Sequence, residues 1–226
     1  MRVLDLHSWD VSTSEAGDLQ RDLATRVVRS RCLHSTPRYI AGTDMSVDRI
    51  RGTARAAAVV IEYPSLELVE VRTAAGPLAW PYVPGFLSFR EAPLVLDALS
   101  MLLIEPDIVM VDGQGIAHPR RLGLASHVGL FIDVPTIGCA KSLLCGEYGA
   151  LGHDRGESAY LVHNEEVIGA AVRTRSEVKP VFVSIGHRFN LAGAVEWVLH
   201  CCGRYRLPEP TRLAHLAAGG KIATTR

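Results

Sequence analysis

Residues 107–112 read Asp-Ile-Val-Met-Val-Asp, and this short stretch decides the fold class. The run between the two aspartates is entirely apolar and rich in β-branched side chains. Such an uninterrupted run is typical of a strand buried on both faces, as in a parallel sheet covered by helices. Helical patterns flank it at 93–103, where Pro93 would occupy the tolerated first turn, and at 122–131. The stretch therefore predicts alternating helices and strands in this part of the chain.

The alternation continues towards the carboxyl end. Strands are expected at 136–140, 167–172 and 181–185, and helices at 191–201 and 208–218, the last with Thr211 ahead of it as a cap. Residues 219–226 are expected to form a frayed, flexible tail.

The amino-terminal part has a different pattern. A helix is expected at 15–33, capped by Ser12 or Ser14. Strand-like stretches at 39–46, 55–63 and 66–73 are separated by short turn-prone breaks, which favours an antiparallel meander. We therefore predict one α/β domain over 1–226, with a mixed sheet in which the meander is followed by alternating helices and strands and is flanked by helices.

The composition is that of a globular protein. Of the 226 residues, 48% are apolar and 21% are charged, which excludes a disordered chain. No apolar run reaches the roughly 18–20 residues of a membrane span, and the first residues lack a signal-peptide core. The five cysteines, Cys32 among them, match no zinc or redox spacing and are expected to be buried thiols. These features together predict a cytoplasmic protein.

The charge is balanced in sum but not in distribution. There are 24 basic and 24 acidic residues, yet 62–119 hold eight acids against two bases, and from Arg204 onward five bases face one acid. An acidic middle suits cations and a basic end suits a phosphate backbone, although both segments could equally be solvated surface.

Three acids stand out by their positions. Asp44 lies inside an otherwise uncharged strand, Asp112 closes the apolar strand, and Glu91 lies at a loop-to-helix junction. A carboxylate within a strand is costly to bury unless it is paired or binds a metal. Each aspartate alone could be a hydrogen-bonded turn former, whereas the three together indicate a site for a hard cation such as Mg²⁺ or Mn²⁺.

The most informative loop is 80–91, Trp-Pro-Tyr-Val-Pro-Gly-Phe-Leu-Ser-Phe-Arg-Glu. Pro81 and Pro84 restrict the backbone on both sides of Tyr82, and this stiffening could hold the ring outward as a wedge that replaces a base in a stack. Packing of the tyrosine onto the core is the alternative.

Other candidate residues follow the predicted strands. Gly113 and Gly115 could let the backbone approach a flat ligand, although a lone G-x-G is weak evidence. His118, beside Arg120 and Arg121, suits phosphate contacts, or it is an exposed loop histidine. Lys141 could reach into a site as a point charge, or it is a solvated surface lysine. His215 on the last helix could be structural.

Taken together, these segments resemble the endonuclease V family, the deoxyinosine 3′ endonucleases. The resemblance runs from Tyr39 to His215 in family order and spacing. The segments that carry it are Gly-Thr-Asp-Met-Ser at 42–46, the loop at 81–91, Asp-Gly-Gln-Gly at 112–115 with His-Pro-Arg at 118–120, Pro-Thr-Ile-Gly at 135–138 with Lys141, and Tyr-Arg-Leu-Pro-Glu-Pro-Thr-Arg at 205–212. The departures are Thr43, where an aliphatic residue is usual, and Val47, where an aromatic is common.

The resemblance implies an RNase H-like fold and Mg²⁺-dependent cleavage of DNA, with Mn²⁺ as a substitute metal. The cut would fall at the second phosphodiester 3′ to a deaminated purine such as deoxyinosine. Asp44, Glu91 and Asp112 would hold the metal, His215 would approach it, and Lys141 would lie near the phosphate or the attacking water. The residues implied in substrate binding are the wedge Tyr82, its neighbours Pro81 and Pro84, the pocket residues Gly85, Leu87, Gly113 and Gly115, and the phosphate contacts His118 and Arg120.

Two other functions stay open from the sequence. A nuclease of the same fold could cut inosine-containing RNA, because discrimination of the 2′-hydroxyl is a local contact. A non-catalytic protein could bind deaminated DNA and recruit a nuclease, but such a protein needs no metal cluster. The expected partner is DNA with deaminated bases, or inosine-containing RNA, with no membrane and no obligate protein partner.

Overall fold

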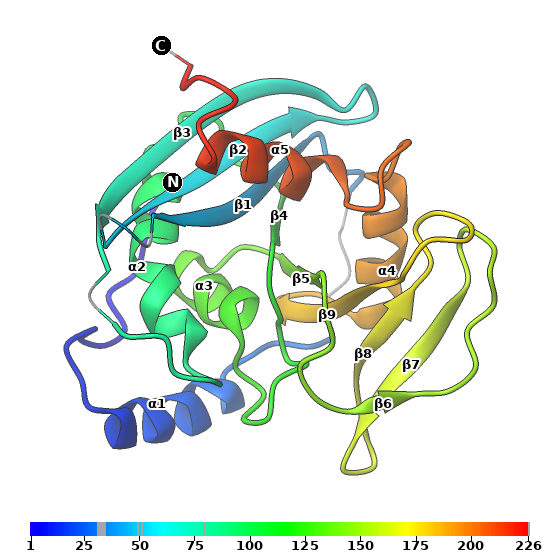
Figure 1. The fold of residues 1–226 in the computed structure, drawn as a ribbon, viewed down its shortest axis with the longest axis horizontal. Helices are drawn as coiled ribbons and strands as arrows, with labels where there is room; N and C mark the ends of the chain where they lie inside the picture. The colour runs from blue at the N-terminus through cyan, green and yellow to red at the C-terminus, as the bar shows by residue number, and fades with distance from the viewer. Residues whose placement is uncertain (31–34, 49, 51, 79, 226) are drawn as a thin grey trace.

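A computed structural model describes residues 1–30, 35–48, 50, 52–78 and 80–225. In this part of the chain nine strands form one mixed sheet, in the order β3-β2-β1-β4-β5-β9-β8-β7-β6 (Figure 1). The strands are β1 (Tyr39–Asp48), β2 (Thr53–Glu62), β3 (Glu67–Pro77), β4 (Ile108–Val111), β5 (Thr136–Ala140), β6 (Glu147–Tyr148), β7 (Ser158–His163), β8 (Glu166–Val172) and β9 (Val181–His187). The helices are α1 (Thr13–Thr25), α2 (Leu87–Ser100), α3 (Leu124–Ile132), α4 (Leu191–His200) and α5 (Glu209–Ala218).

The pairing of the strands confirms the predicted change of pattern. β1, β2 and β3 form an antiparallel meander. β4 then pairs parallel to β1, and β5 pairs parallel to β4. Beyond β5 the sheet becomes antiparallel again through β9, β8, β7 and β6. The carboxyl ends of β1, β4 and β5 therefore lie next to one another, which is where ligands bind in open α/β sheets.

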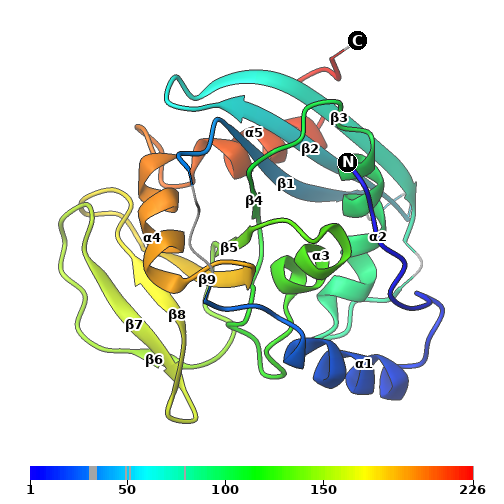
Figure 2. The ribbon, with the colours of Figure 1, turned by 180° about the vertical axis from the view of Figure 1, so that it is seen from behind.

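Helices cover both faces of the sheet (Figures 1 and 2). Alternate residues of β2 show the two layers: Ala58 and Val60 pack with α2 and α3, whereas Ala57 and Val59 pack with α5. This period of two is what a strand buried on both faces requires. The apolar run of β4 is likewise fully buried.

Several boundaries differ from the sequence prediction. α2 begins at Leu87, so Pro93 lies inside the helix rather than in its first turn. The buried side chains Phe89, Ala92 and Val95 extend the helical face across the proline, and their burial outweighs its missing hydrogen bond. Glu91 consequently lies within α2 and not at a loop-to-helix junction.

The first and last helices, α1 and α5, also differ from the sequence prediction. α1 is capped by Ser12, as expected, but it ends at Thr25; positions 31–33 of the predicted helix, Cys32 included, lie outside the described residues. Thr211 lies inside α5 instead of ahead of it, and its hydroxyl donates to the carbonyl of Pro208 at 3.2 Å.

Two strands, β6 and β7, were not predicted from the sequence. Cys139, Cys201 and Cys202 are buried free thiols, and Cys145 is half-buried.

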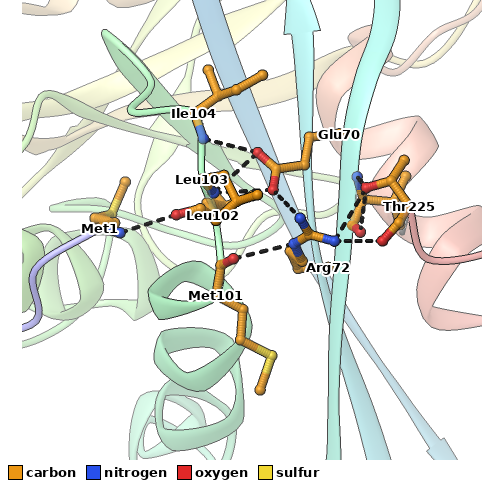
Figure 3. A network of polar contacts seen from close by, with 9 residues as sticks. Met1, Glu70, Arg72, Met101, Leu102, Leu103, Ile104 and Thr225 are labelled. Atoms are coloured by element: carbon orange, nitrogen blue, oxygen red, sulfur yellow. Dashed lines mark hydrogen bonds and ion pairs between the residues drawn. The ribbon is translucent and has the colours of Figure 1, made fainter.

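The carboxyl-terminal segment is not frayed over its described length. The Thr225 amide donates to the carbonyl of Val71 in β3 at 3.1 Å. Arg72 donates to the Thr225 carbonyl and pairs with the buried Glu70 at 2.9 Å, as Figure 3 shows. Glu70 in turn accepts hydrogen bonds from the backbone amides of Leu103 and Ile104. The tail therefore lies along β3 and is tied to the turn after α2.

Candidate active site

An acidic cluster forms where the parallel strands end. Asp44 lies beyond the last residue of β1 that pairs with β4, Asp112 follows β4, and Lys141 follows β5. The Asp112 amide donates to the Thr43 carbonyl at 3.0 Å, which fixes the two aspartates on adjacent strands. The Asp44 and Asp112 side chains are only 12% and 7% exposed.

Two nitrogen-bearing side chains face these aspartates. The Lys141 ammonium contacts Asp112 Oδ2 and lies 3.8 Å from Asp44 Oδ2. His215 Nδ1, on α5, lies 2.7 Å from the same Asp44 oxygen. α5 reaches this point because Pro210 packs directly on Gly42, where any Cβ would approach the Pro210 carbonyl to 2.1 Å. Arg206 holds the carbonyl of Lys141 at 2.6 Å and so fixes the end of β5.

Glu91 adds a third carboxylate to the cluster. Burial, followed by the repulsion of Asp44 and then Asp112, raises the pKa of Glu91 to about 8. Burial and the charge of Asp44 likewise raise the pKa of Asp112 to about 6. Negative charge is therefore in excess here, and a cation would relieve it.

The residues fit a hard cation that keeps part of its water shell. Among the described residues, no group of three or more His, Cys, Asp or Glu side chains is arranged so that it could hold a metal ion by itself. The carboxylates of Asp44, Glu91 and Asp112 nevertheless supply oxygen donors only, in a setting where burial and repulsion oppose the ionisation of Glu91 and Asp112. Mg²⁺ is commonly bound in this way, through one or two carboxylates together with substrate phosphates and water.

A cavity of about 340 Å³ opens beside the cluster. Asp112 and Lys141 line it, so the cavity adjoins the acidic cluster directly. Its walls also include six of the residues predicted for substrate binding, namely Tyr82, Pro84, Gly85, Leu87, Gly113 and His118. Tyr82 is 70% exposed, so packing onto the core is excluded for this residue. Pro81, Gly115 and Arg120 are not among its lining residues. Gly115 instead packs beneath β9, where a Cβ would lie 2.0 Å from the Ile185 carbonyl.

Side chains outside the loop hold the turn at Gly85 by hydrogen bonds to its carbonyl. Its carbonyl accepts hydrogen bonds from His118 Nε2 at 3.0 Å and from Arg120 Nη2 at 2.7 Å, and Gly85 itself has a φ of +80° that favours glycine. Burial, with the nearby Arg120 charge, lowers the pKa of His118 to about 4, so the ring is neutral. Arg121 is engaged with Glu166 at 2.6 Å and with the His163 carbonyl at 3.0 Å. In this structure His118 and the two arginines thus make internal contacts.

A family model for endonuclease V matches residues 21–216. The chain belongs to the endonuclease V family.

Relatives of the endonuclease V family cover almost the whole chain. The endonuclease V of Dehalococcoides mccartyi is 49% identical over 222 residues, which cover 98% of this chain and 99% of the relative. The crystal structure of Streptomyces avermitilis endonuclease V has 40% identity and a TM-score of 0.89, with 97% of each chain covered. A structure of Ciona intestinalis endonuclease V, in complex with a 24-mer DNA containing an inosine followed by a ribo-adenosine, has 30% identity, a TM-score of 0.82, and 92% and 96% coverage of this chain and that one. The predicted RNase H-like fold is confirmed, and the protein is a nuclease.

Sequence reasoning missed one buried residue of this endonuclease V site. Gln20 of α1 is fully buried and donates to the Gly85 carbonyl at 3.0 Å and to the Leu122 carbonyl at 3.2 Å. The available signal was its place on the same helix face as Ala16 and Leu23, where a polar side chain needs partners.

Proposed function

We propose that this protein is a Mg²⁺-dependent endonuclease that acts on DNA containing deaminated purines, above all deoxyinosine. The proposed cut is the second phosphodiester 3′ to the lesion, which leaves the lesion in the nicked strand. The observation that carries the proposal is the junction of two features: the cluster of Asp44, Glu91 and Asp112, and the adjoining cavity with the exposed Tyr82 in its wall.

The cluster supplies what phosphodiester hydrolysis needs. Asp44, Glu91 and Asp112 would hold Mg²⁺, or Mn²⁺ in its place, and the bound metal supplies activation of water and charge neutralisation at the leaving oxygen. Lys141 places a positive charge beside Asp112, where it would meet the non-bridging oxygens of the phosphate. His215 orients the Asp44 carboxylate from α5.

The cavity suits a flat base that has left the duplex. The first turn of α2 lines it through Leu87 and Ser88, and its N-cap Phe86 provides no side-chain cap. Backbone amides at an uncapped helix start are donors, so they would donate to the oxo oxygen of hypoxanthine, whereas the amino group of adenine is itself a donor and offers them a poor partner. Tyr82, stiffened by Pro81 and Pro84, would fill the gap that the extruded base leaves.

Inosine-containing RNA is a second candidate substrate. The Ciona relative was captured on a strand in which a ribo-adenosine follows the inosine. A non-catalytic reader is the less favoured function, because such a protein gains nothing from a repulsive acid cluster. The free thiols of the four described cysteines fit the cytoplasmic location that we propose.

The deciding experiment compares nicking of inosine-containing duplex DNA, the matched RNA and undamaged DNA, with and without Mg²⁺. We expect the unaltered protein to nick inosine DNA only with the metal. Asp44→Ala and Asp112→Ala should each abolish nicking, yet leave inosine-DNA binding measurable in Ca²⁺. Glu105→Ala removes an exposed acid outside the cluster and is the matched control. Robust cleavage by either aspartate variant would overturn the metal assignment, and cleavage of RNA alone would favour the second candidate.

A further inference from the structure

Two histidines outside the acidic cluster form a chain of hydrogen bonds that ends at the cavity. His7 Nε2, in the segment before α1, lies 2.7 Å from Nε2 of His127 in α3. His127 Nδ1 lies 3.0 Å from the hydroxyl of Ser88, in the first turn of α2. His127 is fully buried, Ser88 is 2% exposed, and Ser88 lines the cavity.

With one hydrogen on each imidazole ring, the partners give this chain of hydrogen bonds a single direction. His7 Nδ1 lies 2.8 Å from the Ser8 carbonyl oxygen, which only accepts, so Nδ1 of His7 carries a hydrogen. In neutral His7 the other nitrogen, Nε2, is then an acceptor, and His127 must donate to it from Nε2. His127 Nδ1 is left as an acceptor, and the Ser88 hydroxyl donates to it. Burial holds the pKa of His127 well below its ordinary value, so its ring carries one hydrogen only.

The residue at the end of the chain belongs to a turn that the site depends on. Leu87 and Ser88 form part of the cavity wall, and Glu91 lies one turn further along the same helix. No side chain caps this helix start, since Phe86 is the N-cap and makes no capping hydrogen bond. The Ser88 hydroxyl is directed to His127 instead. This chain of hydrogen bonds thus connects α3 and the amino-terminal segment to the first turn of α2.

We propose that His7 and His127 are positioning residues, which hold the first turn of α2 in register with the acidic cluster through the Ser88 hydroxyl. The catalytic consequence rests on the proposed nuclease function, whereas the chain of hydrogen bonds does not. Aromatic rings surround His7, with ring centroids at 4.6 Å for Trp9 and 5.2 Å for Phe131. A pure packing role is therefore the competing explanation, and the test must separate the two.

Two substitutions at His7 separate hydrogen bonding from packing. His7→Phe keeps an aromatic ring among Trp9, Phe89 and Phe131 but removes the acceptor for His127. His7→Gln loses the ring but retains an amide oxygen at similar reach. If the chain of hydrogen bonds positions α2, the His7→Gln variant should preserve function and the His7→Phe variant should not. If His7 only packs, the order is reversed.

The first readout is the ¹⁵N imidazole NMR spectrum of the full-length protein, which reports the tautomer of His127 without any substrate. We expect the Nε2–H form in the unaltered protein and in His7→Gln. In His7→Phe the hydrogen should move to Nδ1, since an Nε2–H without an acceptor is unfavourable in a buried site.

The second readout is kcat/KM on inosine-containing DNA, with the melting temperature measured on the same preparations. We expect His7→Phe to lose about tenfold, as is typical when an outer partner of a site is removed, and His7→Gln to stay within about twofold. Normal activity of a folded His7→Phe, or a defect confined to His7→Gln, overturns the positioning role. If the unaltered protein cleaves no inosine-containing strand, the proposed function fails, while the spectra still decide whether the chain of hydrogen bonds exists.

Discussion

At the residue scale, the position of Asp44 follows from the two-residue period of β1. Ala41 packs with α2 and α3, whereas Gly42 meets Pro210 of α5. Asp44, two residues beyond Gly42, therefore faces α5, where His215 contacts it at 2.7 Å. A strand aspartate that would otherwise be costly to bury thus lies where the sheet ends and polar partners are within reach.

The wedge role proposed for Tyr82 is also tested at the residue scale. A stacked aromatic is worth roughly 1–3 kcal/mol per base, so Tyr82→Ala should weaken inosine-DNA binding about ten- to a hundredfold, and Tyr82→Phe should keep most of the affinity. Because Tyr82 is 70% exposed, its removal should change stability by less than about 0.5 kcal/mol. Binding measured with Ca²⁺, together with melting curves, checks both expectations.

Tyr160 provides the matched control for this prediction. It is 68% exposed on β7 and is not a lining residue of the cavity beside the acidic cluster. Tyr160→Ala should therefore leave affinity unchanged. Equal losses for the two alanine variants would show that exposed aromatics in general, and not the wedge position, support binding.

At the scale of the elements, strong local patterns were predictable and long-range contacts were not. β5 was predicted at its observed bounds, and β4 to within a residue at each end, because their apolar runs are unambiguous. The start of α2 was missed because the burial of Phe89, decided by tertiary packing, extends the helix across Pro93. The acids could be identified from the sequence, whereas the hydrogen-bond partners of Gln20, His7 and His127 could not, since most of those partners lie far away along the chain.

The segment after α5 is an element whose removal has a predictable cost. Thr225 bonds to Val71 of β3 through both its amide and its hydroxyl, and its carbonyl accepts from Arg72. Deleting residues 223–226 should remove about 1–2 kcal/mol of stability, or roughly 2–8 °C in Tm. It should also expose the edge of β3 and promote self-association, as unpaired edges do.

Thermal melts and sedimentation measure these two effects. Thr225→Val keeps the amide bond and the backbone along β3, so it should lose only part of the stability and remain monomeric if the unaltered protein is. An unchanged Tm and an unchanged sedimentation coefficient after the deletion would mean that the tail does not protect the edge.

At the scale of the whole molecule, folding itself gathers like charges. Asp44 comes from β1, Asp112 from the end of β4, and Glu91 from α2, and only the folded sheet brings them together. The folded state consequently retains protons that the unfolded chain releases: Glu91 titrates at about 8 instead of 4.5, and Asp112 at about 6 instead of 3.8. A folded state that binds more protons loses stability as the pH rises through that interval.

These acids therefore make a distinct contribution to the pH dependence of stability of the metal-free protein. Between pH 4.5 and about 8 their contribution to the free energy of unfolding should fall, and Glu91→Gln should flatten the fall because it cannot ionise. If the cluster holds Mg²⁺ as proposed, the metal would bind only the ionised, folded form, so it should raise the Tm at about pH 8 in a concentration-dependent way and have little effect at about pH 5. The Glu91→Gln variant should show a smaller rise with the metal. Melting curves of both proteins at the two pH values, with and without Mg²⁺, test this. Identical pH profiles for the two proteins, together with no effect of Mg²⁺, would contradict both the repulsion within the cluster and its role in holding the metal.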